Sequence, residues 1–229
     1  MKKNDKYKYP SSTRSEFEGK RLYEVVGHRL PSVTTILSTT KPKAAEESIQ
    51  RWRDRVGHQR SKEIFETSAA RGTALHKYLE MHVLGEGYRD LTNVGQQAEQ
   101  MANIVIKKGL SNVSEYYGIE ATLYYPGLYA GTTDFICVHN GSDTVVDFKQ
   151  TNKPKRREWI DDYFMQLGAY GMAHDHVYGT KINKGVIMMI NPDGYYQEFI
   201  IEGPEFKNYK HKFLKRVDEY YNDYVFQKD

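Results

Sequence analysis

The sequence predicts an α/β fold, with a mixed central β-sheet flanked by helices and preceded by a helical elaboration. Three observations predict it. The first half carries apolar residues at helical spacing, the chain after Ile119 alternates as strands do, and no Pro-, Gly- or Ser-rich linker separates the two. With 229 residues the chain is long enough for one sizeable core. We therefore expect a single domain over 1–229, with a mainly helical part over 1–115 and an α/β core over 116–229.

Four helices are predicted in the first half. Ser32 is the expected N-cap of a short helix that runs through Leu37. The other three are expected over 44–56, 61–83 and 94–105, and the last of them ends before Gly109.

Five strands and two helices are predicted in the second half. Pro126-Gly127 and Asn140-Gly141 are turn signals between the first three strands, and the second pair is typical of a tight hairpin. The expected strands are 119–125, 129–138, 144–150, 184–190 and 195–201. The expected helices are 159–174, between the third and fourth strands, and 206–224, which closes the chain.

Composition excludes several classes of protein. The net charge of +3, from 33 Lys+Arg and 30 Asp+Glu, excludes a polycation but allows a local basic groove. A single cysteine, Cys137, excludes a disulfide framework, a four-cysteine zinc site and an iron–sulfur cluster. The longest apolar run, Val186 to Ile190, is too short to cross a membrane. The polar N-terminus is not a secretory signal, so we expect a cytoplasmic protein of a bacterium or a phage-infected host.

Chemistry is concentrated on two strands joined by a hairpin. Asp134 lies on one strand, and Asp147 and Lys149 share a face of the next because side chains alternate along a strand. If Asp134 opposes them, two carboxylates and an ammonium group converge. Paired carboxylates suit Mg²⁺ or Mn²⁺, and a neighbouring lysine can orient water or stabilise phosphoryl charge. The alternative is a surface ion pair on a half-exposed strand.

Two neighbouring features fit a nucleic-acid substrate. Lys153, Lys155, Arg156 and Arg157 follow in a segment without acids, as in a phosphate-binding loop, although a solvated loop has the same composition. Gln166 and Tyr170 lie four residues apart on the next helix and so face one way. Three roles are open for this pair: contact with the nucleic acid, bracing of the site, or packing of the helix alone.

His76 is a candidate third metal ligand from the first half of the chain. A helix packed over the sheet can aim its imidazole at the strand ends, and Gly72, one turn earlier, is expected to allow a close approach. Glu80, one turn later, is expected to hold the second ring nitrogen. The alternative is a histidine that only packs the core.

These pieces together resemble the PD-(D/E)XK nuclease superfamily, in its RecB-like branch of mitochondrial genome maintenance exonucleases and their phage and bacterial relatives. The resemblance covers most of the chain and rests on motifs in the family's order. They are Pro31-Ser32-Val33-Thr34, Arg51-Trp52, Arg71-Gly72-Thr73-Ala74-Leu75-His76, Gly131-Thr132-Thr133-Asp134, Val145-Val146-Asp147-Phe148-Lys149, Lys153-Pro154-Lys155 and Gln166-Leu167-x-x-Tyr170.

The resemblance implies a restriction-endonuclease-like core and a role for each matching residue. It implies Asp134 and Asp147 as metal-binding acids, Lys149 as the catalytic lysine, the Phe148 carbonyl and His76 as further ligands, and Glu120 as a supporting acid. Gln150 departs from the family, which usually has Thr or Ser at that position. No Walker motif is present, so no nucleotide cofactor is expected.

The sequence therefore predicts a Mg²⁺- or Mn²⁺-dependent DNA exonuclease that favours single strands or flaps and acts in replication, repair or recombination. A catalytically inactive DNA-binding module of the same fold and a structure-specific endonuclease remain alternatives. A tyrosine-rich protein–protein adaptor, from the 19 tyrosines, is an alternative of a different class. Cleavage polarity, RNA tolerance, the number of metal ions and the oligomeric state are left open.

Overall fold

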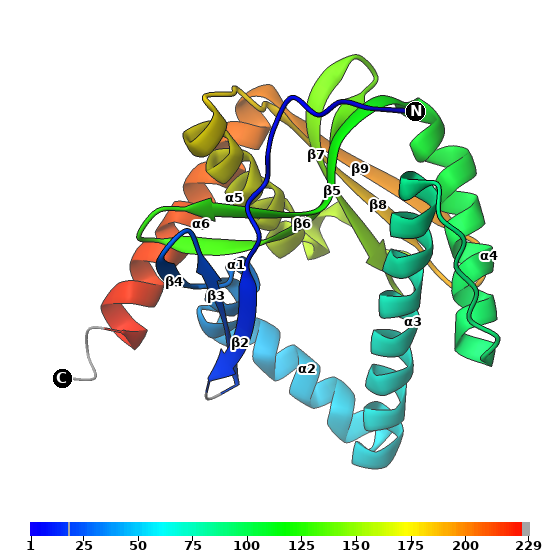
Figure 1. Ribbon diagram of the computed structural model, residues 1–229. Helices are drawn as coiled ribbons and strands as arrows, with labels where there is room; N and C mark the ends of the chain where they lie inside the picture. The colour runs from blue at the N-terminus through cyan, green and yellow to red at the C-terminus, as the bar shows by residue number, and fades with distance from the viewer. Residues whose placement is uncertain (18, 226–229) are drawn as a thin grey trace.

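A six-stranded mixed sheet forms the centre of the molecule (Figure 1). The structure is a computed structural model and describes residues 1–17 and 19–225. The strands, in their order across the sheet, are β1 (Lys2–Lys3), β5 (Val113–Tyr125), β6 (Tyr129–His139), β7 (Ser142–Gln150), β8 (Lys184–Ile190) and β9 (Tyr196–Glu202). The pairs β5–β6, β6–β7 and β8–β9 are antiparallel, whereas β1–β5 and β7–β8 are parallel. The predicted α/β architecture, a mixed central sheet flanked by helices, is confirmed.

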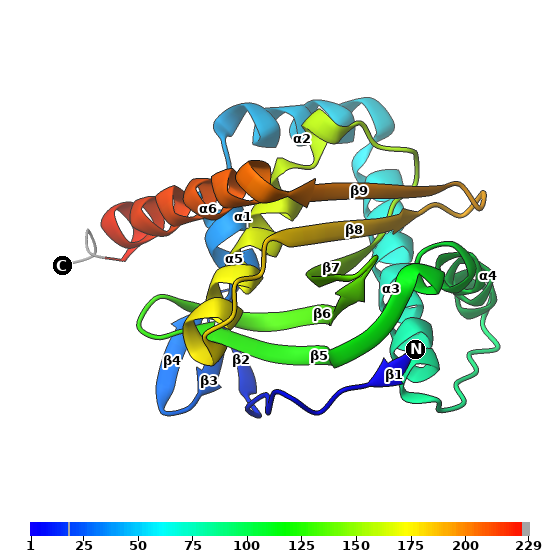
Figure 2. The ribbon, with the colours of Figure 1, turned by 90° about the horizontal axis from the view of Figure 1, so that it is seen from above.

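Helices cover both faces of this sheet (Figure 2). One layer contains α1 (Val33–Thr39), α5 (Asp161–Tyr178) and α6 (Gly203–Tyr224), and the other contains α3 (His58–Leu84) and α4 (Asn93–Lys108). Side chains alternate between the layers: Val145 of β7 packs in the α5 layer and Val146 in the α3 layer. Because both faces are covered, β8 is buried throughout, which explains its apolar run from Val186 to Ile190.

A second, three-stranded sheet near the N-terminus was not predicted. Its strands, in order, are β2 (Thr13–Phe17), β3 (Lys20–Val25) and β4 (His28–Pro31). Tyr23, Val25 and Leu30 of this sheet pack on Ala130 of β6. The alternation that identifies a half-buried strand is weak here, because β2 has no buried residue.

Helix α2 (Lys43–Val56) and the first half of α3 project away from the sheet (Figure 1). Helix α2 has no buried residue, and α3 is mostly exposed before Arg71. Gly57 joins the two helices with φ of 91°, a conformation that favours glycine. We call α2 together with residues 58–70 the helical arm.

The predicted turns and caps are confirmed, and the predicted helices and strands differ from the observed ones at their ends. Asn140 and Gly141 both have positive φ, as a tight hairpin requires, and Ser32 Oγ accepts a hydrogen bond from Thr35 N at 2.9 Å. Strand β5 begins at Val113 rather than at Ile119, so the proposed boundary after residue 115 falls inside it. Within residues 1–17 and 19–225, no helix is long and apolar enough to cross a membrane.

Candidate active site

The site lies where β6 and β7 separate. Their backbone pairing ends with Phe135 opposite Val146, and Asp134 and Asp147 are the next residues on either side of this fork. The Phe148 N–H, beyond the last pair, donates to Asp134 Oδ2 at 2.7 Å. A carboxylate thus replaces a backbone acceptor at the point where the strands diverge.

Asp147 is the most deeply buried acid of the site, with 1% exposure. Lys149 Nζ forms an ion pair with Asp147 Oδ2 at 2.6 Å, and among the described residues no other donor reaches either carboxylate oxygen. Burial raises the pKa of Asp147 to about 6, against the opposing effect of Lys149. A buried carboxylate without hydrogen-bond donors is costly unless a cation lies beside it.

Lys149 is held between the acids and α5. Its Nζ donates to Gln166 Oε1 at 3.3 Å and lies 4.9 Å from the centre of the Tyr163 ring. Burial by itself lowers the pKa of Lys149, but Asp147 and Asp134 outweigh it and raise the pKa above its ordinary value. Lys149 is therefore a cation at neutral pH.

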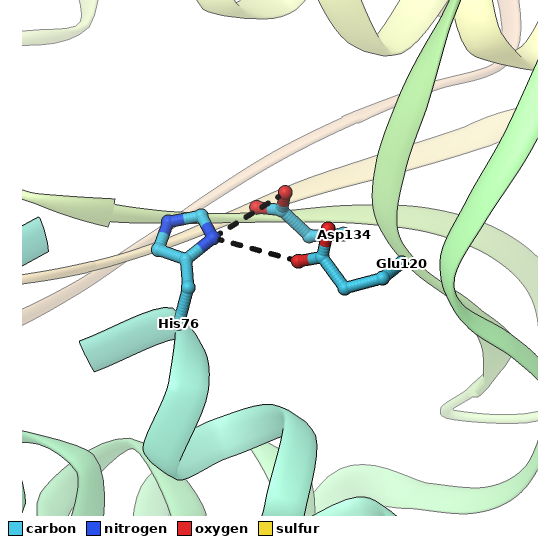
Figure 3. A group of neighbouring side chains, drawn as sticks. All are labelled: His76, Glu120 and Asp134. Carbon is cyan, nitrogen blue, oxygen red and sulfur yellow. Dashed lines mark ion pairs between the residues drawn. The ribbon is translucent and has the colours of Figure 1, made fainter. Parts of the chain in front are cut away.

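His76 of α3 reaches the fork from the face of the sheet opposite to α5. Figure 3 shows its ring facing two carboxylates: Nδ1 lies 3.5 Å from Asp134 Oδ1 and 3.8 Å from Glu120 Oε1. Burial by itself lowers the pKa of His76, but these carboxylates raise it to about 9. The three side chains bring ligand atoms within 4.8 Å of one another.

Glu120 reaches this position through an unusual backbone. It has φ of +48° within β5, the left-handed region that non-glycine residues rarely adopt, and its neighbours Ile119 and Ala121 pair regularly with β6. Such strain persists where the surrounding structure imposes it, frequently at functional sites. The resemblance implied only a supporting role for Glu120, because no local sequence pattern reveals a glutamate with left-handed backbone.

Two expectations about the helix that carries His76 are wrong. Glu80 was expected to hold the second ring nitrogen, but its carboxylate pairs with Lys77 Nζ at 3.0 Å, and the acids facing His76 are Glu120 and Asp134. Gly72 was expected to permit close packing, but a Cβ there would meet no atom within 4 Å. Gly72 instead lines a cavity of about 840 Å³ beside His76.

Gln166 and Tyr170 lie on the face of α5 toward the sheet. Gln166 accepts from Lys149, and Tyr170 is only 3% exposed, so its ring is not available for stacking on a base. A Cβ on Gly131 would lie 2.9 Å from the Tyr170 hydroxyl oxygen, so a larger residue there would displace the Tyr170 side chain. Of the roles left open by the sequence, bracing the site is the one that this geometry favours.

The four cations of the basic segment have different environments. Arg157 is held by the Ile200 carbonyl at 2.9 Å and by Glu205 Oε1 at 2.6 Å, which favours a structural role over phosphate binding. Lys153 and Lys155 line a second cavity, of about 1050 Å³. Arg156 is exposed, with its guanidinium 5.3 Å from the ring centre of Trp159.

Sequence reasoning missed Arg71 and Tyr163 as individual site residues. Arg71 is 7% exposed and ties α3 to α4 and to the end of β7. Its guanidinium donates to Gln150 Oε1 at 2.8 Å, Gln97 Oε1 at 2.6 Å and Asn152 Oδ1 at 2.8 Å. Arg71 is the first residue of the sequence motif that ends in His76, and this position could have marked it as a site residue. Gln150, the departure from the family pattern, thus has a defined partner.

The donor set fits a divalent cation. Carboxylate oxygens from Glu120 and Asp134 converge with the His76 imidazole, and Asp147 lies on the other side of the fork, with its carboxylate paired with Lys149. Hard oxygen ligands suit Mg²⁺ and Mn²⁺, and Mn²⁺ also accepts an imidazole nitrogen. The Phe148 carbonyl as a further ligand stays a prediction.

No protein-family model matches the chain. The solved structures similar to it include a Eubacterium rectale protein with a provisional exonuclease name (TM-score 0.48, 16% identity, 66% of this chain and 64% of that one) and an alkaline exonuclease from Laribacter hongkongensis (TM-score 0.32, 13% identity, 66% of this chain and 80% of that one).

Curated relatives are more informative. The chain is 29% identical to "Mitochondrial genome maintenance exonuclease 1" of Mus musculus and 28% identical to that of Homo sapiens, in each case over 83% of its own length. It spans 59% of the mouse protein and 58% of the human protein, so it corresponds to somewhat more than half of these relatives. The resemblance predicted from the motifs is confirmed: this chain is similar in sequence, over most of its length, to the mitochondrial genome maintenance exonucleases.

Proposed function

We propose that this chain is a Mg²⁺- or Mn²⁺-dependent DNA exonuclease that favours single strands or flaps and acts in DNA replication, repair or recombination. We also propose that residues 1–229 form a single nuclease domain. The observation that carries the proposal is the fork between β6 and β7, where Asp134, Asp147 and Lys149 meet His76 and Glu120. An inactive DNA-binding module has no need for this complete set.

His76, Glu120, Asp134 and Asp147 are the residues proposed to hold the metal. When bound, a divalent ion polarises the scissile phosphate and lowers the pKa of a water molecule that attacks it. The Phe148 N–H fixes the orientation of the Asp134 carboxylate, and the left-handed backbone of Glu120 aims its side chain at the same point. The ligands are therefore arranged before a metal binds.

Lys149 acts as a fixed positive charge. A lysine ammonium offers three hydrogen-bond donors and no acceptor, so Lys149 can orient the attacking water or bind a phosphoryl oxygen. Gln166 and Asp147 hold its ammonium group in place. A preorganised cation of this kind stabilises charge that develops on the phosphate in the transition state.

DNA is proposed to approach over the basic segment that follows β7. Lys153 and Lys155 lie beside Tyr163, whose ring lies near Lys149. Neutralisation of phosphates by such side chains releases counterions and supplies affinity independent of sequence. Arg156 extends this surface, whereas Arg157 is tied to β9 and α6.

The test is a cleavage assay with single-stranded DNA labelled separately at the 5′ and 3′ ends. Wild type, Lys149→Ala and the exposed control Lys207→Ala are compared with Mg²⁺, with Mn²⁺ and with a chelator. We expect wild type and Lys207→Ala to degrade the strand from one end only when metal is present, and Lys149→Ala to be at least about a hundredfold slower.

Other outcomes separate the alternatives. Internal fragments from both labels would indicate the structure-specific endonuclease, and binding without cleavage would indicate the inactive module. Faster cleavage of the matching RNA strand would overturn the choice of DNA. Wild-type rates in Lys149→Ala would remove the catalytic assignment altogether.

A further inference from the structure

The N-terminal strap, residues 1–12, runs along β5 at the edge of the central sheet (Figure 2). Its first part, β1, pairs in parallel with the beginning of β5. Its last residue reaches the far part of the same strand, because Ser12 Oγ lies 2.9 Å from Thr122 Oγ1. The strap therefore contacts β5 both before and after Glu120, one of the proposed metal ligands.

Strand β5 changes face at Glu120. Ile119 packs in the α3 layer, whereas Ala121 and Leu123 pack in the α5 layer. In a regular strand Ile119 and Ala121 would share a face, because side chains alternate. The left-handed backbone of Glu120, with φ of +48°, lies at this switch. The direction of the Glu120 side chain therefore depends on how the two parts of β5 around it are held.

Tyr9 of the strap lies directly beside this switch. Its ring packs on Gly118, where a Cβ would be only 2.6 Å from the ring atom Cε2 of Tyr9. The Tyr9 hydroxyl lies 3.1 Å from His174 Nε2, and its ring packs edge-on against Tyr178 with 5.4 Å between centroids. Both of these residues belong to α5, so Tyr9 joins the part of β5 before Glu120 to a helix of the core.

We propose that the strap positions Glu120 for metal binding and that Tyr9 is the positioning residue through which it acts. The proposal rests on the proposed function, since it takes Glu120 as a metal ligand, and it assigns a role to a segment outside the site. A strained backbone persists only where the surrounding structure imposes it. Tyr9 and Ser12 supply that constraint, one on each side of Glu120.

The test is calorimetric titration of Mn²⁺ into the metal-free protein, without DNA, to compare dissociation constants. Glu120→Gln removes a ligand and should weaken binding at least about tenfold. Tyr9→Ala leaves every proposed ligand in place but removes the ring, and it should also weaken binding about tenfold, as loss of a residue that orients a ligand does. Tyr9→Phe keeps the ring and loses only the hydroxyl contact with His174, so it should bind as wild type does.

Tyr7→Ala is the matched control. Tyr7 belongs to the same aromatic cluster, where its ring packs edge-on against Tyr117 and His174. Tyr117 is also held by Asp143, whose Oδ1 accepts a hydrogen bond from its hydroxyl at 2.7 Å. In urea denaturation Tyr7→Ala should lose stability as Tyr9→Ala does, but its Mn²⁺ affinity should stay within about twofold of wild type.

Gly118→Ala reaches the same contact from β5. Its methyl group would occupy the place of the Tyr9 ring, so this variant should weaken Mn²⁺ binding as Tyr9→Ala does. In the double variant the two losses should not add, because each substitution breaks the same contact. Circular dichroism checks the fold, and either single variant tests the contact if the other does not fold.

Four results would overturn the role of Tyr9. They are wild-type affinity in Tyr9→Ala or Gly118→Ala, an equal loss in Tyr7→Ala, an equal loss in Tyr9→Phe, and additive losses in the double variant. If Glu120→Gln still weakens Mn²⁺ binding in these cases, only the inference about the strap fails. Wild-type affinity in Glu120→Gln, or a wild type that binds no Mn²⁺, would overturn the proposed metal site together with the inference.

Discussion

The two halves of α3 differ more than any two neighbouring parts of the molecule. After Arg71 the helix packs on the sheet and buries Leu75, Leu79 and Val83, and it carries His76 to the acids of the fork. Before Arg71 most residues are exposed, and the helix contacts α2, which has no fully buried residue. One half is therefore expected to provide stability and catalytic geometry, and the other to present side chains to a ligand.

The largest change in cleavage rate is expected at the fork between β6 and β7, which the buried half of α3 contacts through His76. Asp147→Asn removes a charged ligand from the proposed metal site, so the rate of DNA cleavage should fall at least about a thousandfold while circular dichroism keeps its native form. Asp54→Asn, the same substitution on the arm, should cleave within about twofold of wild type. Retained activity of Asp147→Asn at saturating Mg²⁺ would contradict the site.

Two substitutions on α3 compare its halves directly. Leu79 is fully buried and Phe65 is 46% exposed. Leu79→Ala should lower the free energy of unfolding by about 2–5 kcal/mol through the cavity that it creates, whereas Phe65→Ala should cost less than about 1 kcal/mol. Urea denaturation measures both, and a larger loss for Phe65→Ala would reverse our description of the arm.

His174 is buried on α5, in the layer that α5 forms with α1 and α6, and it can serve as a pH probe of the core. Burial lowers the pKa of His174 to about 4, and its ring contacts the hydroxyls of Tyr9 at 3.1 Å and Thr180 at 2.8 Å. The unfolded chain binds this proton near pH 6.5 and the folded chain only near pH 4, so stability should fall between these values on acidification, by up to about 3 kcal/mol.

Denaturation at pH 7.5 and pH 5 checks this expectation. His174→Gln should be less stable than wild type at pH 7.5 but should lose less stability on acidification. An identical pH dependence in the two proteins would show that His174 does not control it.

The smallest effects are expected in the basic segment, where two exposed lysines can be compared with the packed Arg157. Lys153→Gln with Lys155→Gln should weaken binding of single-stranded DNA about tenfold and flatten its salt dependence. Arg157→Gln should leave the salt dependence unchanged and lower the free energy of unfolding by about 1 kcal/mol, because Arg157 is bound to Ile200 and Glu205. A flatter salt dependence in Arg157→Gln would place this residue on the DNA.

The sequence predicted best what local chemistry determines. Asn140-Gly141 predicted a hairpin because few other residues tolerate positive φ, and the apolar run from Val186 to Ile190 predicted a strand. Alternation within the hairpin placed Asp147 and Lys149 on one face, and the structure joins them at 2.6 Å.

What was missed depends on packing between distant elements. The sequence allows either Glu80 or Glu120 to face His76. Only the position of α3 relative to β5 decides between them, and it places Glu120 there. The network of Arg71 joins residues 26 to 81 positions apart, and no periodicity reveals it. Strands β2 to β4 are short and β2 buries no residue, so the hydrophobic pattern from which strands are predicted covers only a few residues of β3 and β4.

The central claim is that His76, Glu120, Asp134 and Asp147 form one divalent metal site. Calorimetric titration of Mn²⁺ into the metal-free protein, without DNA, tests it most directly. We expect one saturable binding event in wild type and in the neighbouring control Lys77→Ala, at least about tenfold weaker binding in His76→Ala, and no measurable binding in Asp134→Asn. Wild-type binding curves in both His76→Ala and Asp134→Asn would contradict the claim.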